Sequence, residues 1–186
     1  MDRVLITEHL VLRPYETGDA SAIEALANNW NVARMLGRMP YPYEPGMAAQ
    51  FMAGHDEARA RGTDFPFAVT CADAFIGGSG LHCTEHSGGD GSLELGYWLG
   101  EPFWGRGYAT EAGRAVIRFG FEALGLNQIL AGHFEENPAS GHVLEKLGFR
   151  YIGQTQRHCL ARGCAVRSRE MALTRAEWAS MDRDLR

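Results

Sequence analysis

The sequence predicts an α+β fold, in which a mixed sheet is flanked by helices within one domain that spans residues 1–186. Two observations support this. Extended stretches follow one another in the middle of the chain with only short turns between them, which favours antiparallel pairing. Helical stretches then fall between the later strands without a regular β-α-β alternation, which is typical of α+β proteins. The length of 186 residues and the apolar content of 45% suit a single globular core.

The N-terminal part is expected to begin with a short strand and a helix. Residues 10–13 (LVLR) form the strand, which Pro14 ends. Ser21 followed by Glu24 matches a capping box, and this pattern predicts a helix near residues 19–29.

A loop with three prolines at residues 38–45 separates this helix from the next elements. Residues 46–61 have a continuous apolar side and predict a second helix. Residues 65–71 and 75–83 then read as two antiparallel strands joined by a turn at residues 72–74.

The second half of the chain has clearer boundaries. A loop, a strand, a helix and a strand are expected, in this order, at residues 85–91, 92–99, 109–124 and 128–133. Asn137 is a good N-cap, Pro138 suits the first helical position, and Gly148 stops a helix, so residues 137–147 are predicted to be helical. Two closing strands and a last helix follow at residues 149–159, 165–174 and 175–184.

Composition and charge exclude several classes of protein. The net charge is −5 and the chain has no run of Lys or Arg, so neither nucleic acid nor an anionic membrane is expected as a partner. No stretch approaches the ~18 apolar residues of a membrane span. The spacing of histidines and cysteines fits no common zinc pattern, so no metal is expected. The four cysteines are expected to be reduced thiols, and the charged N-terminus has no apolar signal core. Both features indicate a cytoplasmic protein.

The segment from residue 94 to residue 112 suggests a phosphate-binding turn. A strand enters a loop with Gly105 and Gly107, and the loop opens directly into a helix. The first amides of a helix have no intrahelical partner and carry partial positive charge, and glycines let an anion come close. The alternative is a strand–turn–helix junction that needs small residues only for packing. A Walker loop is excluded because no Gly-Lys-Ser/Thr follows, and Thr110 disfavours a dinucleotide fingerprint.

Two motifs of the chain, in their order and spacing along the sequence, resemble motifs of the GCN5-related N-acetyltransferase (GNAT) superfamily. The run GYWL followed by WGRGYATEA, and the later run NPASGHVLEKLGF, are similar to its branch of RimJ/RimL-type ribosomal-protein-alanine acetyltransferases. The opening LVLRPYETGDA also resembles that branch, so the likeness covers nearly the whole chain. Trp104 departs from the superfamily pattern, which has Gln or Arg at this position.

The resemblance implies a mostly antiparallel sheet in which two neighbouring parallel strands, residues 92–99 and 128–133, splay apart to admit acetyl-CoA. Backbone groups of Tyr97, Trp98 and Leu99 would pair with the pantetheine arm, and one of these amides would polarise the thioester carbonyl. The pyrophosphate would be held by the amides of Gly105, Arg106, Gly107, Tyr108, Ala109 and Thr110. Arg106 would either add its charge to this contact or remain a solvated loop residue.

The resemblance also suggests catalytic residues. Glu94 is the candidate base that removes the amine proton through water, with two alternatives: an anchor for the substrate ammonium, or a structural strand residue. Leu144 stands where many members have a tyrosine that protonates the CoA thiolate. Ser140 is the candidate for that role, against a plain helix residue, and Asn137 would orient Ser140 or the pantetheine.

The expected activity is transfer of the acetyl group of acetyl-CoA to an amine, above all the N-terminal α-amine of a protein or peptide. The alternatives are acetylation of a small amine, such as an amino acid, a polyamine or an antibiotic, and a non-catalytic acyl-CoA-binding domain. The resemblance further implies a monomer or a homodimer.

Overall fold

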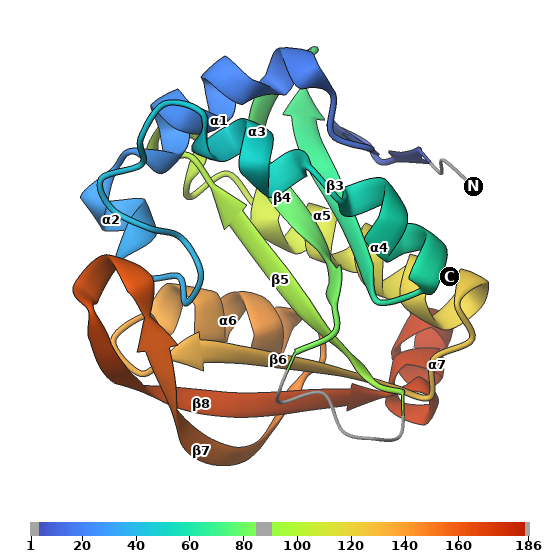
Figure 1. The fold of residues 1–186 in the computed structure, drawn as a ribbon. Helices are drawn as coiled ribbons and strands as arrows, with labels where there is room; N and C mark the ends of the chain where they lie inside the picture. Colours follow the sequence, from blue (N-terminus) through green and yellow to red (C-terminus); the bar gives the residue numbers. More distant parts are fainter. Residues whose placement is uncertain (1–3, 85–90, 185–186) are drawn as a thin grey trace.

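The computed structural model describes residues 4–84 and 91–184. Within these ranges eight strands form one sheet in the order β1-β2-β3-β4-β5-β6-β8-β7 (Figure 1). The strands are β1 (Leu5–Ile6), β2 (Leu10–Arg13), β3 (Asp64–Cys71), β4 (Ala74–His82), β5 (Leu93–Leu99), β6 (Gln128–Phe134), β7 (Arg150–Cys159) and β8 (Cys164–Thr174). Among the described neighbours, β5 and β6 pair in parallel and the others pair antiparallel, so the predicted mixed, mostly antiparallel sheet is confirmed.

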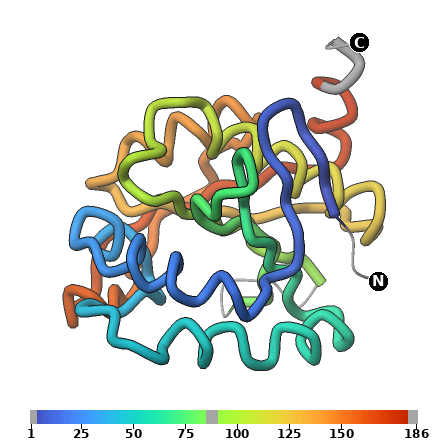
Figure 2. Tube along the Cα trace, turned by 90° about the horizontal axis from the view of Figure 1, so that it is seen from above, coloured from blue at the N-terminus to red at the C-terminus, as the bar shows by residue number. Residues whose placement is uncertain are grey.

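Helices cover both faces of the sheet, as the view from above shows (Figure 2). They are α1 (Ala20–Ala27), α2 (Trp30–Ala33), α3 (Met47–Met52), α4 (His55–Arg61), α5 (Tyr108–Arg118), α6 (Pro138–Lys146) and α7 (Arg175–Asp184). Helices α1, α3 and α4 lie in front of the sheet in Figure 1, and α5 and α6 lie behind it. We call the first the α1 face and the second the α5 face.

Two apolar cores match these two faces. The larger core joins leucines of the central strands, such as Leu81 and Leu95, to Val116 of α5 and Leu144 of α6. The smaller core packs α1, through Ile23 and others, against the opposite face of β3 and β4. Alternate residues of a strand point to opposite faces, so each central strand contributes to both cores.

Strands β5 and β6 separate soon after they meet. Their described pairing consists of Leu93 with Ile129 and Glu94 with Leu130. On its other edge β5 stays paired with β4 as far as Leu99. The sheet therefore opens beyond Glu94 on the β6 side, and the predicted splay of these two strands is confirmed.

Several boundaries in the first half of the chain differ from the sequence prediction. The single helix at residues 46–61 is wrong, because the chain breaks between α3 and α4, where Gly54 has φ of 92°. The capping box is also wrong: Ser21 lies inside α1, and the Glu24 carboxylate accepts the amide of Gly46 instead, at 2.8 Å. The two-residue β1 and the four-residue α2 were not predicted, since segments this short leave no periodic signal.

The second half agrees better. Asn137 caps α6 by accepting the Ser140 amide, and Gly148 ends the helix with φ of 91°, as predicted. The helix predicted at residues 109–124 is present as α5 and a π-helical turn at Phe119–Ala123. Most of the loop predicted at residues 85–91 lies outside the described residues.

Candidate active site

The glycine loop at the start of α5 has the backbone expected of an anion cradle. Gly105 and Gly107 have φ of 73° and 83°, a left-handed conformation that favours glycine. Gly107 is the N-cap of α5. A Cβ atom placed on either glycine would meet no described atom within 4 Å, so the loop faces open space. Arg106 is exposed between the two. These features fit a bound pyrophosphate.

Trp104, at the position where the resemblance expects Gln or Arg, fixes the loop to the strand before it. Its indole N–H donates to the carbonyl of Leu99 at 2.7 Å. The short 3-10 turn between them, Glu101–Phe103, is tied in addition to α2, because Asn29 and Asn31 donate to the Glu101 carboxylate at 2.7 and 3.1 Å. One of the backbone groups in the stretch predicted to pair with pantetheine, the Leu99 carbonyl, therefore already has a partner.

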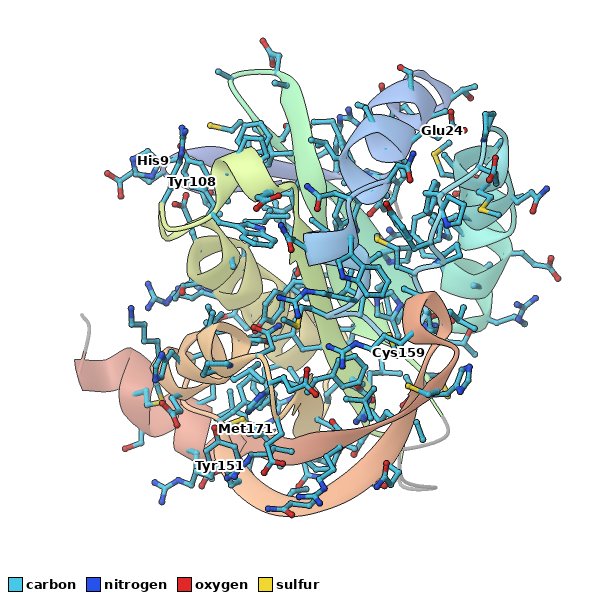
Figure 3. The ribbon with its side chains drawn as sticks, turned by 90° about the vertical axis from the view of Figure 1, so that its left-hand side faces the viewer. His9, Glu24, Tyr108, Tyr151, Cys159 and Met171 are labelled. Carbon is cyan, nitrogen blue, oxygen red and sulfur yellow. The ribbon has the colours of Figure 1, made fainter. Side chains whose placement is uncertain are left out.

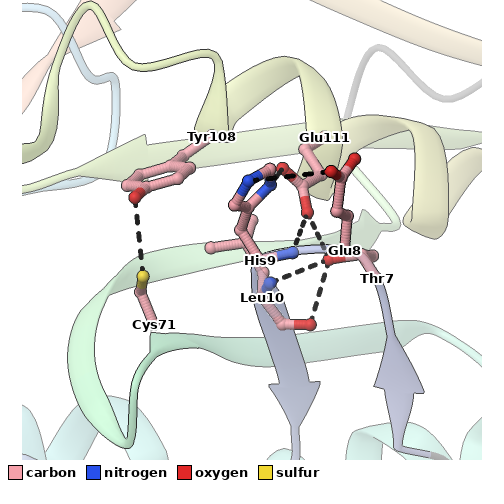
Figure 4. Close-up of polar contacts among 7 residues, drawn as sticks. All are labelled: Thr7, Glu8, His9, Leu10, Cys71, Tyr108 and Glu111. Carbon is pink, nitrogen blue, oxygen red and sulfur yellow. Dashed lines mark hydrogen bonds and ion pairs between the residues drawn. The ribbon is translucent and has the colours of Figure 1, made fainter.

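An acidic residue in the first turn of α5 is held by the hairpin of β1 and β2 (Figure 4). Figure 3 shows His9 of this hairpin beside Tyr108 at the start of α5. The Glu111 carboxylate accepts the Thr7 hydroxyl at 2.6 Å and the amide of His9 at 2.8 Å. Burial alone would raise the pKa of Glu111, but these hydrogen bonds and the His9 ring outweigh it, and the pKa is lowered. In Figure 4 this carboxylate points toward the hairpin, and Tyr108 contacts Cys71 instead, with Oη and Sγ 3.6 Å apart.

A hydroxyl pair joins β5 to α6 beside the opening in the sheet. The Tyr97 hydroxyl lies 2.8 Å from Ser140 Oγ and 3.1 Å from the Ser140 carbonyl. Burial raises the pKa of Tyr97 to about 12, although the hydrogen bond with Ser140 acts against this shift. The Asn137 side chain accepts the Ser140 amide at 3.2 Å, so it positions this serine through the backbone.

Leu144, at the position where a tyrosine is usual, belongs to the core of the α5 face and is 1% exposed. His133 on β6 is buried nearby. Its Nδ1 lies 2.9 Å from the carbonyl of Phe134, and its Nε2 lies 3.2 Å from the hydroxyl of Tyr151. Leu144 therefore offers no acid.

Glu94 lies at the last described pair of β5 with β6 and points to the α1 face. Its side chain is 10% exposed. One oxygen accepts Arg157 Nη1 at 2.5 Å and the other accepts the Thr84 hydroxyl at 2.8 Å. Arg157 comes from β7 and also donates Nε to Glu170 of β8 at 2.9 Å. Two carboxylates thus share one guanidinium next to the opening.

A second polar pair lies beside Glu94 on the same face. His82 pairs with Glu94 across β4 and β5, and its Nδ1 lies 2.9 Å from Asp64 Oδ1 on β3. Burial alone would raise the pKa of Asp64, but the contact with His82 outweighs it, and the pKa is lowered. The α1 face thus presents a row of charged groups at the edge where the sheet opens.

The structure brings Tyr97 and Ser140 together on the α5 face, where the glycine loop begins α5, and Glu94 points to the opposite face. The contact of the Tyr97 side chain and the partners Arg157 and Glu170 were not predicted from the sequence. Arg157 follows Glu94 by 63 positions, so no local pattern could have revealed the pair.

The described residues hold no group of three or more His, Cys, Asp or Glu side chains that could bind a metal ion. In the same part of the chain no helix is long and apolar enough to cross a membrane.

Comparisons with known proteins agree with this geometry. A family model described as an acetyltransferase (GNAT) domain matches residues 9–150. The chain is 31% identical over 163 residues to the N-acetyltransferase YoaA of Bacillus subtilis, covering 86% of this chain and 90% of YoaA. The solved structure of Mycobacterium smegmatis RimJ in complex with CoA-disulfide superposes with a TM-score of 0.80 at 25% identity, over 90% of this chain and 83% of RimJ. The [ribosomal protein uS5]-alanine N-acetyltransferase of Escherichia coli is 32% identical over 84 residues, 45% of this chain and 43% of that enzyme.

Proposed function

The chain belongs to the GNAT acetyltransferase family and is an acetyl-CoA-dependent acyltransferase, and from this premise we propose that it acetylates the N-terminal α-amine of a protein or peptide. The resemblance to the RimJ/RimL-type branch is confirmed by the likeness to RimJ. The uS5-alanine enzyme, which matches over part of its length, acts on an alanine of a ribosomal protein by its name.

The observation that carries the proposal is the opening between β5 and β6, with the glycine loop and Ser140 on one side and Glu94 on the other. Gly105, Arg106 and Gly107, with the first amides of α5, would hold the pyrophosphate. Bound acetyl-CoA supplies an acetyl group on a thioester, whose C–S bond breaks as the amine nitrogen forms a C–N bond. The chain's own task is to bind the neutral amine on the α1 face and to move one proton from it.

Glu94 is proposed to accept this proton through water. Among the described residues, Arg157 and Thr84 donate to this carboxylate, one to each oxygen, and each oxygen has a second acceptor position. The ion pair with Arg157 holds the Glu94 carboxylate in a fixed position beside the opening. If this pairing dominates, Glu94 acts as the anchor of the ammonium instead.

The cost of removing the amine proton favours an acceptor that loses this proton easily. An α-amine has a pKa of about 7.7–8.0, whereas a lysine side chain has about 10.4. At pH 7 the neutral form costs roughly 1 kcal/mol for the α-amine and roughly 4–5 kcal/mol for the lysine. This difference supports a peptide α-amine over a lysine or a polyamine.

The test is release of free CoA from acetyl-CoA over a panel of acceptors. The panel contains peptides with a free N-terminus, the same peptides with a blocked N-terminus and an internal lysine, and small amines. We expect turnover with free N-termini and at least about 100-fold less with blocked ones, in line with the pKa difference. Faster turnover with small amines would show that the acceptor is a small amine and not a protein N-terminus. Tight acetyl-CoA binding without CoA release for any amine would favour a non-catalytic domain.

A further inference from the structure

We propose that the Tyr97 side chain is a positioning residue for Ser140, and that the two hydroxyls together stabilise the CoA sulfur as it leaves. The inference rests on the proposed function, because it assigns a task at that site to a side chain whose backbone alone was expected to matter. The two hydroxyls would also take over the task for which many members use a tyrosine at the position of Leu144.

The geometry defines which hydroxyl donates to which. A carbonyl only accepts, so the bond of 3.1 Å places the Tyr97 hydrogen on the Ser140 carbonyl. The Tyr97 oxygen is then free to accept from Ser140 Oγ at 2.8 Å. Two bonds to one residue hold the first turn of α6 against β5 and fix the orientation of the serine hydroxyl.

The same pair can reorganise when negative charge appears on the sulfur. Ser140 Oγ–H turns to the sulfur, and Tyr97 Oη–H turns from the carbonyl to Ser140 Oγ. A hydroxyl that receives a hydrogen bond on its oxygen is a stronger donor, because chains of hydrogen bonds polarise one another. As the amine nitrogen bonds to the acetyl carbon, the C–S bond breaks and the sulfur leaves with its electron pair as a thiolate. Ser140 donates a hydrogen bond to this thiolate and keeps its proton, and the thiolate takes up a proton from solvent after it leaves.

Tyr97 is a donor in this scheme and not the source of the proton. Its pKa, raised to about 12 by burial, lies well above the ~8.5 of a thiol, so the phenol stays protonated while the sulfur is ionised. His133, a buried titratable side chain beside α6, contacts Tyr151 and the carbonyl of Phe134.

Tyr97→Phe removes the hydroxyl and keeps the ring. We expect kcat to fall about tenfold with an unchanged KM for acetyl-CoA, since one hydrogen bond in the transition state is lost. In Ser140→Ala, kcat should fall by at least as much. Because Tyr97 acts through Ser140, the double variant should lose no more than Ser140→Ala alone. Tyr151→Phe is the matched control: it removes a hydroxyl beside α6 that bonds His133, and it should keep wild-type turnover.

A second measurement does not use turnover. Ultraviolet titration of the complex with free CoA, corrected for the protein alone, gives the pKa of the bound thiol. We expect it to lie about one pH unit below the ~8.5 of a free thiol in the wild type and to return toward that value in Tyr97→Phe and Ser140→Ala.

Wild-type kcat in Tyr97→Phe together with an unmoved thiol titration would overturn the inference. Independent losses that multiply in the double variant would also overturn it, because Tyr97 would then act without Ser140. A wild type that releases no CoA with any amine but still shifts the thiol pKa through both hydroxyls would defeat the proposed function and leave this inference standing.

Discussion

The two faces of the sheet are built in different ways. The α5 face takes its proposed acetyl-CoA site from one continuous stretch, β5 to α6, in which glycine conformations, helix starts and an N-cap would do the binding. The α1 face takes its site from side chains far apart in the sequence, with Glu94, Arg157 and Glu170 supplied by β5, β7 and β8. Local sequence determines backbone sites, whereas side-chain sites depend on which strands become neighbours.

This difference has a functional meaning. A pyrophosphate presents the same oxygens in every acyl-CoA, and backbone amides suffice to bind it. The amine acceptor is proposed to bind on the other face, where Glu94 and its charged partners present side chains. The α5 face should therefore control acetyl-CoA affinity, and the α1 face should control turnover and acceptor choice.

The largest effect is expected from a substitution on the α1 face. Glu94→Gln keeps the shape of the side chain and removes the charge. If Glu94 is the base, kcat should fall by roughly 10²–10³ while acetyl-CoA affinity stays near the wild-type value. The loss should shrink at high pH, where the amine is already neutral. Steady-state kinetics from pH 6.5 to pH 9.5 measure kcat and its pH dependence, and calorimetric titration measures the affinity for acetyl-CoA.

Glu170→Gln is the matched control, because it removes a carboxylate from the same guanidinium but outside β5. It should change kcat much less. A higher acceptor KM with unchanged kcat in Glu94→Gln would identify an anchor. Wild-type kcat and KM in that variant would leave Glu94 as a structural partner of Arg157.

The next largest effect is expected from a substitution on the α5 face. Gly107→Val places a β-branched residue at φ of 83° and projects a side chain into the space in front of the loop. We expect acetyl-CoA to bind about 100-fold more weakly, equivalent to ~2.7 kcal/mol. Gly125→Val is the control, since Gly125 also has a positive φ, of 73°, but lies outside the loop. Unchanged affinity in a folded Gly107→Val would remove the pyrophosphate assignment.

A smaller effect concerns how α1 is attached. Arg13 of β2 donates two hydrogen bonds of 2.8 Å to Asp19, which precedes α1 and whose side chain is 6% exposed. Asp19→Asn should reduce the free energy of unfolding by about 2 kcal/mol, because it leaves a partly buried guanidinium without its charge partner. Urea denaturation measures this. Glu57→Gln, in an exposed pair with Arg61, should cost less than about 0.5 kcal/mol.

The same carboxylate predicts a response to acid. Burial would raise the pKa of Asp19, but Arg13 and the Glu16 amide lower it, so the folded value lies below the unfolded one of about 3.9. The unfolded chain then binds the proton more readily, and stability falls as the pH drops below about 5. We expect the fall in thermal midpoint between pH 5 and pH 3 to be smaller in Asp19→Asn. An equal fall in both proteins would show that Asp19 does not contribute.

The smallest effect tests the attachment of α5. Glu111→Gln weakens the bonds to Thr7 and His9 and should cost about 1 kcal/mol of folding free energy. Because backbone groups form the anion site, acetyl-CoA affinity should change by less than about threefold. A large loss of affinity would mean that the hairpin, and not the local backbone, shapes the glycine loop.

Prediction from sequence succeeded where a local pattern is long or strongly punctuated. Asn137, Pro138 and Gly148 define α6 within one residue of the structure, because caps act on their own neighbours. It failed for the helix at residues 46–61, where the apolar pattern continues across Gly54 although the backbone turns there. It also failed for Ser21 and Glu24, since Asp19, held by Arg13, brings the start of α1 forward.

The sequence by itself determined the family, the order of the main elements and the glycine loop, because each of these is encoded in contiguous residues. Only the tertiary structure decided that Glu94 shares Arg157 with Glu170 and that Tyr97 meets Ser140. The physical reason is that strand order is not chain order: β8 lies between β6 and β7, and α5 connects the parallel strands β5 and β6. Side chains 43 and 63 positions apart become partners only when α6 packs beside β5 and when β7 and β8 join the same sheet.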